Sequence, residues 1–258
     1  MPWVSPQAGQ LAIIIDDLGY NLALGKRATD LAGDFTFAVL PFTPHGIELA
    51  ERAHKRGKEI MLHAPMSNER QLPLGKGALV SGMTRQDFIQ VLREDLANIP
   101  HIKGVNNHMG SQLTQDTDSM SWLMQELKTR QLYFVDSRTT PKTQALAMAE
   151  AAQVPSRKRD VFLDDQRDIE HIRQQLVLAV KTARQQGSAV AIGHPYRNTL
   201  EVLEHIQPLL DKYQVQLVKA SNLMPMHYSS ISYCAAPPVY LWTSTPRKVN
   251  PVTVELLF

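Results

Sequence analysis

The stretch Ile13-Ile14-Ile15-Asp16-Asp17-Leu18-Gly19 constrains this 258-residue chain more than any other. A run of branched apolar residues is typical of a strand that is buried on both faces of a parallel sheet. Two adjacent carboxylates, Asp16 and Asp17, follow this run directly. An unpaired buried carboxylate costs several kcal/mol, so two of them at one strand end indicate a bound cation or a proton to be moved. The sequence therefore predicts a functional site at the end of this strand.

The rest of the chain alternates short apolar strands with amphipathic helices. We expect eight strands, at residues 11–16, 35–40, 59–63, 104–107, 133–136, 161–163, 189–193 and 216–218. Seven helices are expected between them, at residues 22–31, 43–56, 84–99, 119–130, 142–150, 169–186 and 199–212. This alternation is typical of parallel βα units and predicts an α/β fold, a small TIM-like barrel. A doubly wound sheet is the alternative, because strand order is not visible in one sequence.

Three regions are expected along the chain: an N-terminal extension (1–10), the barrel domain (11–220) and an irregular C-terminal tail (221–258). The tail loses the βα alternation and carries no recognisable chemistry. Two helix starts have capping residues, Thr84 with Asp87 three positions later, and Asp168 before the helix at 169–186.

Composition excludes several classes of protein. The net charge is +2, and no basic stripe with interleaved aromatic residues indicates nucleic-acid binding. The single cysteine, Cys234, excludes an intramolecular disulfide and a cysteine-based zinc site. No apolar run reaches the ~20 residues of a membrane span. Residues 1–6 show no export signal. A leader that has been removed, or a start codon assigned too far downstream, would explain this.

Six of the eight expected strands end in Asp or His, and in parallel α/β folds functional groups gather at these carboxyl ends. Alone, each has an ordinary explanation, since an Asp after a strand often caps a helix. Together, Asp17, His63 and His108 offer one carboxylate and two imidazole ligands. Three such ligands plus a water form the open site of a catalytic zinc ion or another divalent metal. Asp16 is then placed to take a proton from water, and His194 to protonate a leaving amine. This set predicts hydrolysis of an amide or ester.

Five segments carry a resemblance to a known family, and they occur in the family's order. They are Ala12-Ile13-Ile14-Ile15-Asp16-Asp17-Leu18-Gly19, Glu59-Ile60-Met61-Leu62-His63-Ala64-Pro65-Met66, Gly104-Val105-Asn106-Asn107-His108-Met109-Gly110-Ser111, Phe134-Val135-Asp136-Ser137-Arg138-Thr139 and Ile192-Gly193-His194-Pro195. With them, residues 11–218 resemble the divergent polysaccharide deacetylase family, a branch of the NodB-like carbohydrate esterases. The resemblance implies an irregular (β/α)7-type barrel that removes acetyl groups from an envelope polysaccharide or oligosaccharide. It also implies a periplasmic or cell-envelope location.

The resemblance also implies residue roles. The first Asp of the pair, Asp16, is the base; the second, Asp17, binds the metal; and His194 assists the leaving group. Such relatives carry two metal-binding histidines four residues apart, but Ser67 stands at that spacing after His63, so His108 must supply the second imidazole.

The expected metal is a divalent ion, with zinc as the first candidate. Further residues of these segments are expected to lie around it. Asp136, Ser137 and Arg138 are expected to bind substrate, and Asp136 or Ser137 could instead orient His194. The arginine motif that usually steadies the base in such relatives is not evident in this sequence, and Arg138 is expected to substitute for it. Asn107 and Ser111 are expected to hydrogen-bond the metal-binding histidines.

Two other functions stay open at this point. One is a barrel that binds glycans as a scaffold without efficient catalysis, favoured by the missing histidine pair. The other is a hydrolase of phosphoesters on the same metal site, which lacks the support of a Gly-rich phosphate cradle or clustered basic residues. The sequence does not predict an oligomeric state.

Overall fold

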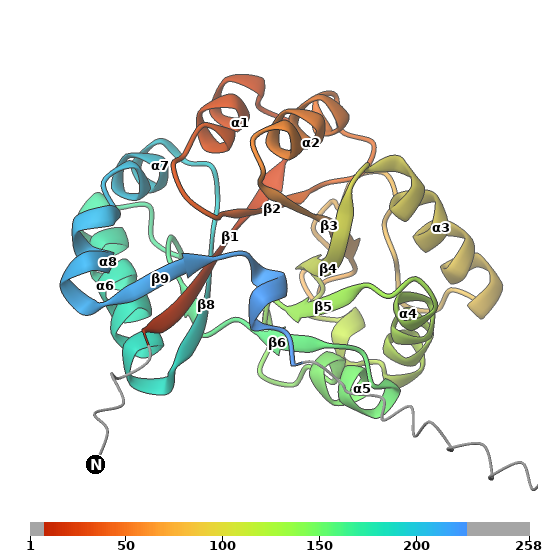
Figure 1. Ribbon diagram of the computed structural model, residues 1–258. Coiled ribbons are helices and arrows are strands. Elements are labelled where there is room, and N and C mark those ends of the chain that lie inside the picture. The colour runs from red at the N-terminus through yellow and green to blue at the C-terminus, as the bar shows by residue number, and fades with distance from the viewer. Residues whose placement is uncertain (1–7, 226–258) are drawn as a thin grey trace, which may run out of the picture. The chain divides into compact units, whose positions relative to one another are not determined.

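The computed structural model describes residues 8–225, which form a curled parallel sheet with helices around its outer side (Figure 1). Its strands are β1 (Gly9–Leu18), β2 (Thr36–Val39), β3 (Glu59–Met66), β4 (Ile102–Met109), β5 (Tyr133–Asp136), β6 (Ser156–Lys158), β7 (Val161–Phe162), β8 (Ser188–Gly193) and β9 (Val215–Val218). Its helices are α1 (Leu22–Thr29), α2 (Gly46–Lys55), α3 (Arg85–Asn98), α4 (Thr117–Thr129), α5 (Ala145–Ala152), α6 (Ile169–Gln186), α7 (Arg197–Glu204) and α8 (Gln207–Tyr213), with short 3-10 helices η1 (Leu113–Gln115) and η2 (Ala220–Leu223).

The sheet has the strand order β6-β5-β4-β3-β2-β1-β8-β7, and all its pairs are parallel. Its two end strands, β6 and β7, are separated by only Arg159 and Asp160. The backbone N–H of Arg159 donates to Asp136 O at 2.9 Å, and that of Asp160 donates to Val190 O at 2.8 Å. One broken strand thus spans from β5 to β8. The predicted irregular barrel is confirmed, and the doubly wound alternative is wrong.

Strand β9 shares one edge of β1 with β2. It pairs with Gly9–Ala12 of β1, whereas β2 pairs with the later part of β1, from Ile14 to Leu18. With the broken strand counted once, seven strands surround the barrel, and β9 is an addition at the start of β1.

Several boundaries differ from the prediction. Strand β1 starts at Gly9, inside the expected extension, and β6 is a strand that the sequence analysis missed. The helix expected at 199–212 is two helices, because Pro208 in the first turn of α8 lacks the N–H that would continue α7. The first residues of the expected tail form η2, while its part from 226 onward, with Cys234, lies outside the described residues.

Two predicted helix caps are confirmed. The side chain of Thr84 accepts from the backbone N–H of Asp87 at 3.2 Å, and Asp168 Oδ1 accepts from the N–H groups of Glu170 and His171 at 2.9 and 3.0 Å. These bonds satisfy N–H groups that the first helical turn leaves without partners.

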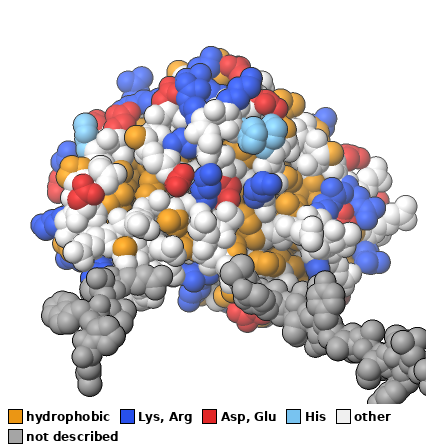
Figure 2. All heavy atoms as spheres, viewed as in Figure 1, with side chains coloured by type: hydrophobic (Ala, Val, Ile, Leu, Met, Phe, Trp, Pro, Cys, Tyr) orange, Lys and Arg blue, Asp and Glu red, His pale blue; other side chains and the backbone are white. Residues whose placement is uncertain are grey.

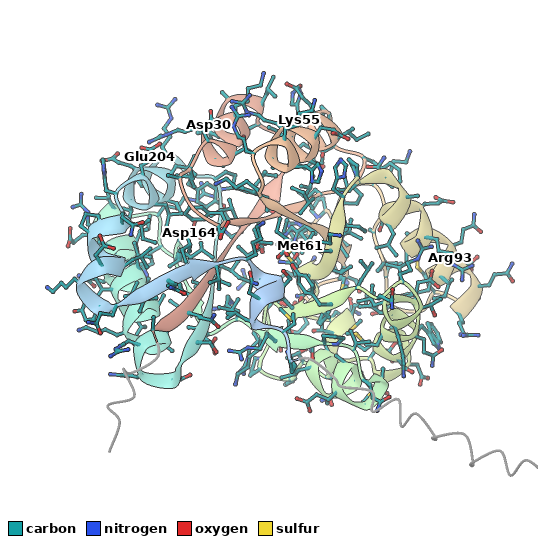
Figure 3. The ribbon with its side chains drawn as sticks, viewed as in Figure 1. Asp30, Lys55, Met61, Arg93, Asp164 and Glu204 are labelled. Atoms are coloured by element: carbon teal, nitrogen blue, oxygen red, sulfur yellow. The ribbon has the colours of Figure 1, made fainter. Side chains whose placement is uncertain are left out.

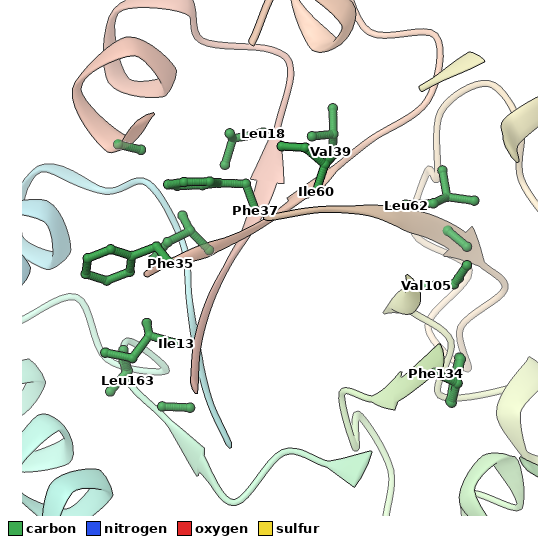
Figure 4. Close-up of a cluster of buried hydrophobic side chains, with 14 of the residues drawn as sticks. Ile13, Leu18, Phe35, Phe37, Val39, Ile60, Leu62, Val105, Phe134 and Leu163 are labelled. Atoms are coloured by element: carbon green, nitrogen blue, oxygen red, sulfur yellow. The ribbon is translucent and has the colours of Figure 1, made fainter. Parts of the chain in front are cut away.

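The strands bury both of their faces, as their sequence predicts. Along β1, Ile13 and Ile15 belong to the core between sheet and helices, whereas Ala12 and Ile14 belong to a second cluster inside the barrel. Figure 4 shows the outer cluster, and Figure 3 shows Met61 of β3 within the barrel. Because side chains alternate along a strand, this pattern determines which polar residues at the strand ends face the barrel axis.

The amino ends of the strands are covered by η2. Glu59 Oε1 accepts hydrogen bonds from Thr36 Oγ1 at 3.1 Å, Tyr133 Oη at 2.9 Å and the backbone N–H of Ser221 at 3.0 Å. This buried carboxylate ties η2 to β2, β3 and β5. The opposite, carboxyl ends of the strands are where the sequence analysis places its candidate residues.

The helices between residues 8 and 225 include none that is long and apolar enough to cross a bilayer. On the face seen in Figure 2, lysine and arginine side chains are interspersed with aspartate and glutamate.

Candidate functional site

The carboxyl ends of the strands surround a cleft of about 280 Å³. Strand alternation turns Asp16, His63 and His108 toward the barrel axis, and His194 follows β8 on the same side. The cleft is lined by Asp16, Asp17, His63, Asn107, His108, Met109, Ser137, Thr139, Arg159, Phe162, Ile192 and His194. The structure therefore brings together five of the residues that the sequence singled out for chemistry: Asp16, Asp17, His63, His108 and His194.

Asp17 enters the cleft through an unusual backbone conformation. Simple alternation would turn it away from the side of Asp16. Its φ of 58° is left-handed, and the pairing of β1 with β2 shifts register between Ile15 and Leu18. Met109 and Arg138, at the ends of β4 and β5, also have positive φ, 54° and 52°. Each such non-glycine residue costs about 1–3 kcal/mol, and such strain clusters at functional sites.

Three ligand atoms meet within the cleft. Asp17 Oδ1 lies 2.9 Å from His108 Nδ1 and 3.2 Å from His63 Nε2, and the two ring nitrogens are 3.1 Å apart. A tetrahedral zinc ion with bonds of ~2.0–2.1 Å separates its ligand atoms by about 3.3 Å. Among residues 8–225, Asp17 Oδ1 is buried without an aligned hydrogen-bond donor. The donor set and its spacing fit a divalent metal.

The electrostatics of this cluster favour a positive charge. Burial opposes the ionised form of Asp17, but the neighbouring His108 and His63 lower its pKa well below the usual range. Burial likewise disfavours a charged His63, yet the carboxylates of Asp16 and Asp17 raise its pKa. The two carboxylates thus favour a cation beside them, either an imidazolium or a metal ion.

Asp16 lies deeper than Asp17 and has a different partner. Its side chain is buried, and Asn106 Nδ2 donates to its Oδ1 at 2.8 Å. The same amide accepts through Oδ1 from His63 Nδ1 at 2.7 Å. Burial raises the pKa of Asp16, against the attraction of His63 and His194. A raised pKa makes a carboxylate a better proton acceptor.

His194 lies beside Asp17, one of the three candidate metal ligands. Its Nε2 lies 3.7 Å from Asp17 Oδ2, while its Nδ1 donates to Asp164 Oδ1 at 2.9 Å. Asp164 Oδ2 accepts from the backbone N–H of His194 and from Thr199 Oγ1, both at 2.7 Å. Although burial opposes it, the bond to Asp164 raises the pKa of His194 to about 9. The ring of Tyr196 stacks on His194, and the guanidinium of Arg167 lies over the Tyr196 ring, 4.0 Å from the ring centre.

The residues expected to bind substrate lie in different places. Ser137 lines the cleft, and its buried Oγ has no hydrogen-bond partner among the described residues. Asp136 points to the helix side, where it accepts from the Arg138 N–H and from Thr143 Oγ1. Arg138 is exposed, outside the set of residues that line the cleft.

The structure corrects the predicted hydrogen-bond partners of the histidines. Asn107 Oδ1 accepts from the Ser137 N–H at 2.9 Å, and its Nδ2 donates to Met109 O at 2.7 Å. Ser111 Oγ accepts from the Glu69 N–H at 3.1 Å. Asn107 does not bond His108, because adjacent residues alternate in direction along β4. Ser111 lies beyond the end of β4 and bonds Glu69 instead of a histidine.

Three residues in the site were missed by the sequence analysis. The side chain of Asn106, rather than that of Asn107, lies on the same face of β4 as His108. The alternation of side chains along a strand, counted back two residues from His108, would have identified it. Asp164 orients His194 in place of Asp136 or Ser137, and Asp16 is held by Asn106 rather than by Arg138. Arg159 lines the cleft and donates to the carbonyls of Ser137 and Arg138 at 2.8 and 3.1 Å. No local motif singles out Arg159.

The fold of this chain is similar to that of two solved proteins. The solved structure of an uncharacterized protein, ATU2773 from Agrobacterium tumefaciens C58, superposes with a TM-score of 0.81 at 21% identity, covering 86% of this chain and 92% of that one. The catalytic domain of a peptidoglycan N-acetylglucosamine deacetylase from Eubacterium rectale has a TM-score of 0.50 at 14% identity, covering 84% and 90% of the two chains. At these identities the likeness concerns the fold alone.

Sequence relatives are closer. Uncharacterized protein YibQ of Escherichia coli K12 is 40% identical over 217 residues, which cover 84% of this chain and 68% of that protein. A model of the divergent polysaccharide deacetylase family matches residues 13–224. This match includes the carboxyl end of β1 with Asp16 and Asp17, the strands that carry His63 and His108, and the segment with His194. The chain belongs to the divergent polysaccharide deacetylase family.

Proposed function

We propose that this protein is a metal-dependent deacetylase of an acetylated envelope polysaccharide or oligosaccharide. The observation that carries the proposal is the convergence of Asp17, His63 and His108 between a buried carboxylate, Asp16, and a charged imidazole, His194. Membership of the family supports the substrate class. We also propose that the protein works in the periplasm or cell envelope, where such glycans lie.

Asp17, His63 and His108 would hold the divalent ion, with zinc as the first candidate. When bound there, such an ion supplies Lewis acidity, which polarises the acetyl carbonyl and makes water acidic near neutral pH. His63 and His108 come from adjacent strands, so their rings are held by the sheet rather than by a loop. Ligands on rigid elements keep their geometry with little cost in ordering.

Asp16 would act as the general base. Its Oδ2 lies 3.7 Å from His63 Nε2, so it borders the metal ligands without being one of the three. It would accept the proton of the water that attacks the acetyl carbonyl. General base catalysis of this kind contributes typically about 10²–10⁴-fold to the rate.

His194 would act as the general acid. Its Nδ1–H donates to Asp164, so the charged ring presents Nε2–H to the cleft, where it can protonate the leaving amine as the carbon–nitrogen bond breaks. Water and amide then become acetic acid and amine, with one proton taken by Asp16 and one given by His194, and the acid passes its proton to the amine or to water to leave acetate. Ser137 lines the same cleft, and its buried Oγ is unpaired within residues 8–225, so we propose that it contacts the bound substrate.

The test combines metal analysis with acetate release from N-acetylated oligosaccharides. We expect about one zinc per wild-type chain and its loss in His63→Ala/His108→Ala. Asp16→Asn should keep the metal but lose at least 100-fold in turnover. The exposed carboxylate Asp34 offers a matched control, and Asp34→Asn should behave as wild type.

Retained turnover in Asp16→Asn would refute the role of that residue. Saturable glycan binding without acetate release by the metal-loaded wild type would favour a scaffold protein instead.

A further inference from the structure

We propose that Asn106 is a positioning residue that couples the two halves of the site: one amide fixes the ring tautomer of His63 and orients the carboxylate of Asp16. The inference deepens the proposed function and rests on it. Asn106 is fully buried on β4, and both ends of its side-chain amide are engaged in the cleft floor.

The register of the sheet places this amide. Asn106 is the direct partner of His63 in the parallel pairing of β4 with β3, and His108 is the partner of Pro65. Asn106 and His108 are two residues apart, so both face the barrel axis. One strand therefore supplies a metal ligand and, one position deeper, the residue that supports the other imidazole and the base.

The hydrogen-bond inventory determines which way the amide points. An ionised Asp16 has only acceptors, so the group at 2.8 Å from its Oδ1 must be the amide NH₂. The amide oxygen then faces His63 Nδ1 at 2.7 Å, and that nitrogen must carry the ring proton. The lone pair of the neutral His63 ring is therefore on Nε2, the atom that lies 3.2 Å from Asp17 Oδ1. Partners of this kind fix a metal-binding histidine, and their loss costs about 10–100-fold in metal affinity or activity.

Asp16 depends on the same amide. Asn106 Nδ2 is its one uncharged hydrogen-bond donor among residues 8–225, whereas His63, His194, Asp17 and Arg159 act on it through their charges. If the Asn106 amide rotated to improve its hydrogen bond with Asp16 or His63, it would therefore lose the hydrogen bond with the other residue. Asn106 acts through Asp16 and His63, and the proposal gives it no contact with substrate or metal.

Two substitutions separate the two halves of this role. Asn106→Asp keeps an oxygen for His63 Nδ1–H but replaces the donor to Asp16 with a second carboxylate. Asn106→Leu has a similar size and removes both bonds. The control is Asn98→Ala at the end of α3, away from the cleft. It also removes a side-chain hydrogen bond, the one that Asn98 Oδ1 accepts from the Phe42 N–H at 2.8 Å.

The experiment measures zinc affinity of the metal-free full chain against a competing chelator, and acetate release at saturating zinc. For Asn106→Asp we expect a zinc Kd within threefold of wild type but a kcat at least 100-fold lower. For Asn106→Leu we expect a Kd weakened 10–100-fold and a low kcat that added zinc does not restore. Asn98→Ala should leave both quantities unchanged, and thermal unfolding checks that each variant is folded.

The outcomes are distinct. Wild-type zinc affinity and kcat in Asn106→Leu would overturn the inference while leaving the proposed function intact. Equal weakening of zinc binding in the Asp and Leu variants would overturn the role of the amide oxygen. A wild type that neither binds zinc nor releases acetate would overturn the proposed function, and the inference with it.

Discussion

Replacing Asp95 by asparagine should stabilise the protein by an amount that grows with pH. Asp95 lies on α3 and is fully buried, and neither of its carboxylate oxygens has a hydrogen-bond partner among residues 8–225. It packs against Gly77, in the segment that leads from β3 to α3. A charged carboxylate without a partner in such a place is strongly disfavoured.

The magnitude follows from the two protonation equilibria. Burial, helped by the neighbouring Glu94, raises the pKa of Asp95 from 3.8 to about 8. Between these pH values the folded protein keeps the proton and the unfolded chain releases it. The free energy of unfolding therefore falls by about 1.4 kcal/mol for each pH unit through this window. The accumulated loss at pH 7 is about 4 kcal/mol, a large part of the ~5–15 kcal/mol of a typical domain.

Urea unfolding of wild type and Asp95→Asn, at several pH values between 5 and 8, measures this loss. Asparagine does not titrate, so the difference in unfolding free energy should rise by about 1.4 kcal/mol per pH unit and level off near pH 8. The exposed Asp34 serves again as control, since Asp34→Asn should show no such growing difference. Parallel pH curves for wild type and Asp95→Asn would refute the reasoning.

Three further changes test other parts of the structure. Gly77→Ala should lower the unfolding free energy by about 1–3 kcal/mol or more, measured by urea unfolding, because φ is 82° and the new Cβ would clash with Asp95 Oδ1. Glu59→Ala should cost about 2–4 kcal/mol in the same assay, since two buried donors and one partly buried donor lose their acceptor, and an equal stability would contradict the tie to η2. Asp164→Asn should lower kcat by about 10–100-fold with unchanged zinc content, because His194 loses the carboxylate that orients and charges it. Full turnover in that variant would argue against His194 as the acid.

Much of this fold could be predicted because its signals are local. The apolar runs of β1 and β8, and the caps Thr84 and Asp168, depend on residues that are neighbours in sequence. The convergence of Asp16 with His63 also follows from a general rule, since parallel strands end at the same side of a sheet.

The features that were missed depend on direction and register. Choosing between Asn106 and Asn107, or between Asp136 and Asp164, requires knowing which side of the sheet each residue faces. A single register shift in β1 turns Asp17 into the cleft, and its left-handed φ leaves no mark in the sequence. The broken strand around Arg159 is likewise set by long-range pairing with β5 and β8. The two-residue alternation of side chains along a strand, counted from His108, would have favoured Asn106 over Asn107.

The register between β3 and β4 therefore carries the site as well as the fold. Pairing of His63 with Asn106 places the amide under the imidazole, and His108 follows two positions later. A slip of one residue would turn Asn106 and His108 toward the helices and bring Val105 and Asn107 to face the axis. Val105 is part of the outer apolar core, so the same burial that stabilises the sheet opposes this slip. His108, one of the proposed metal ligands, is thus positioned by hydrophobic packing on the opposite face of its own strand.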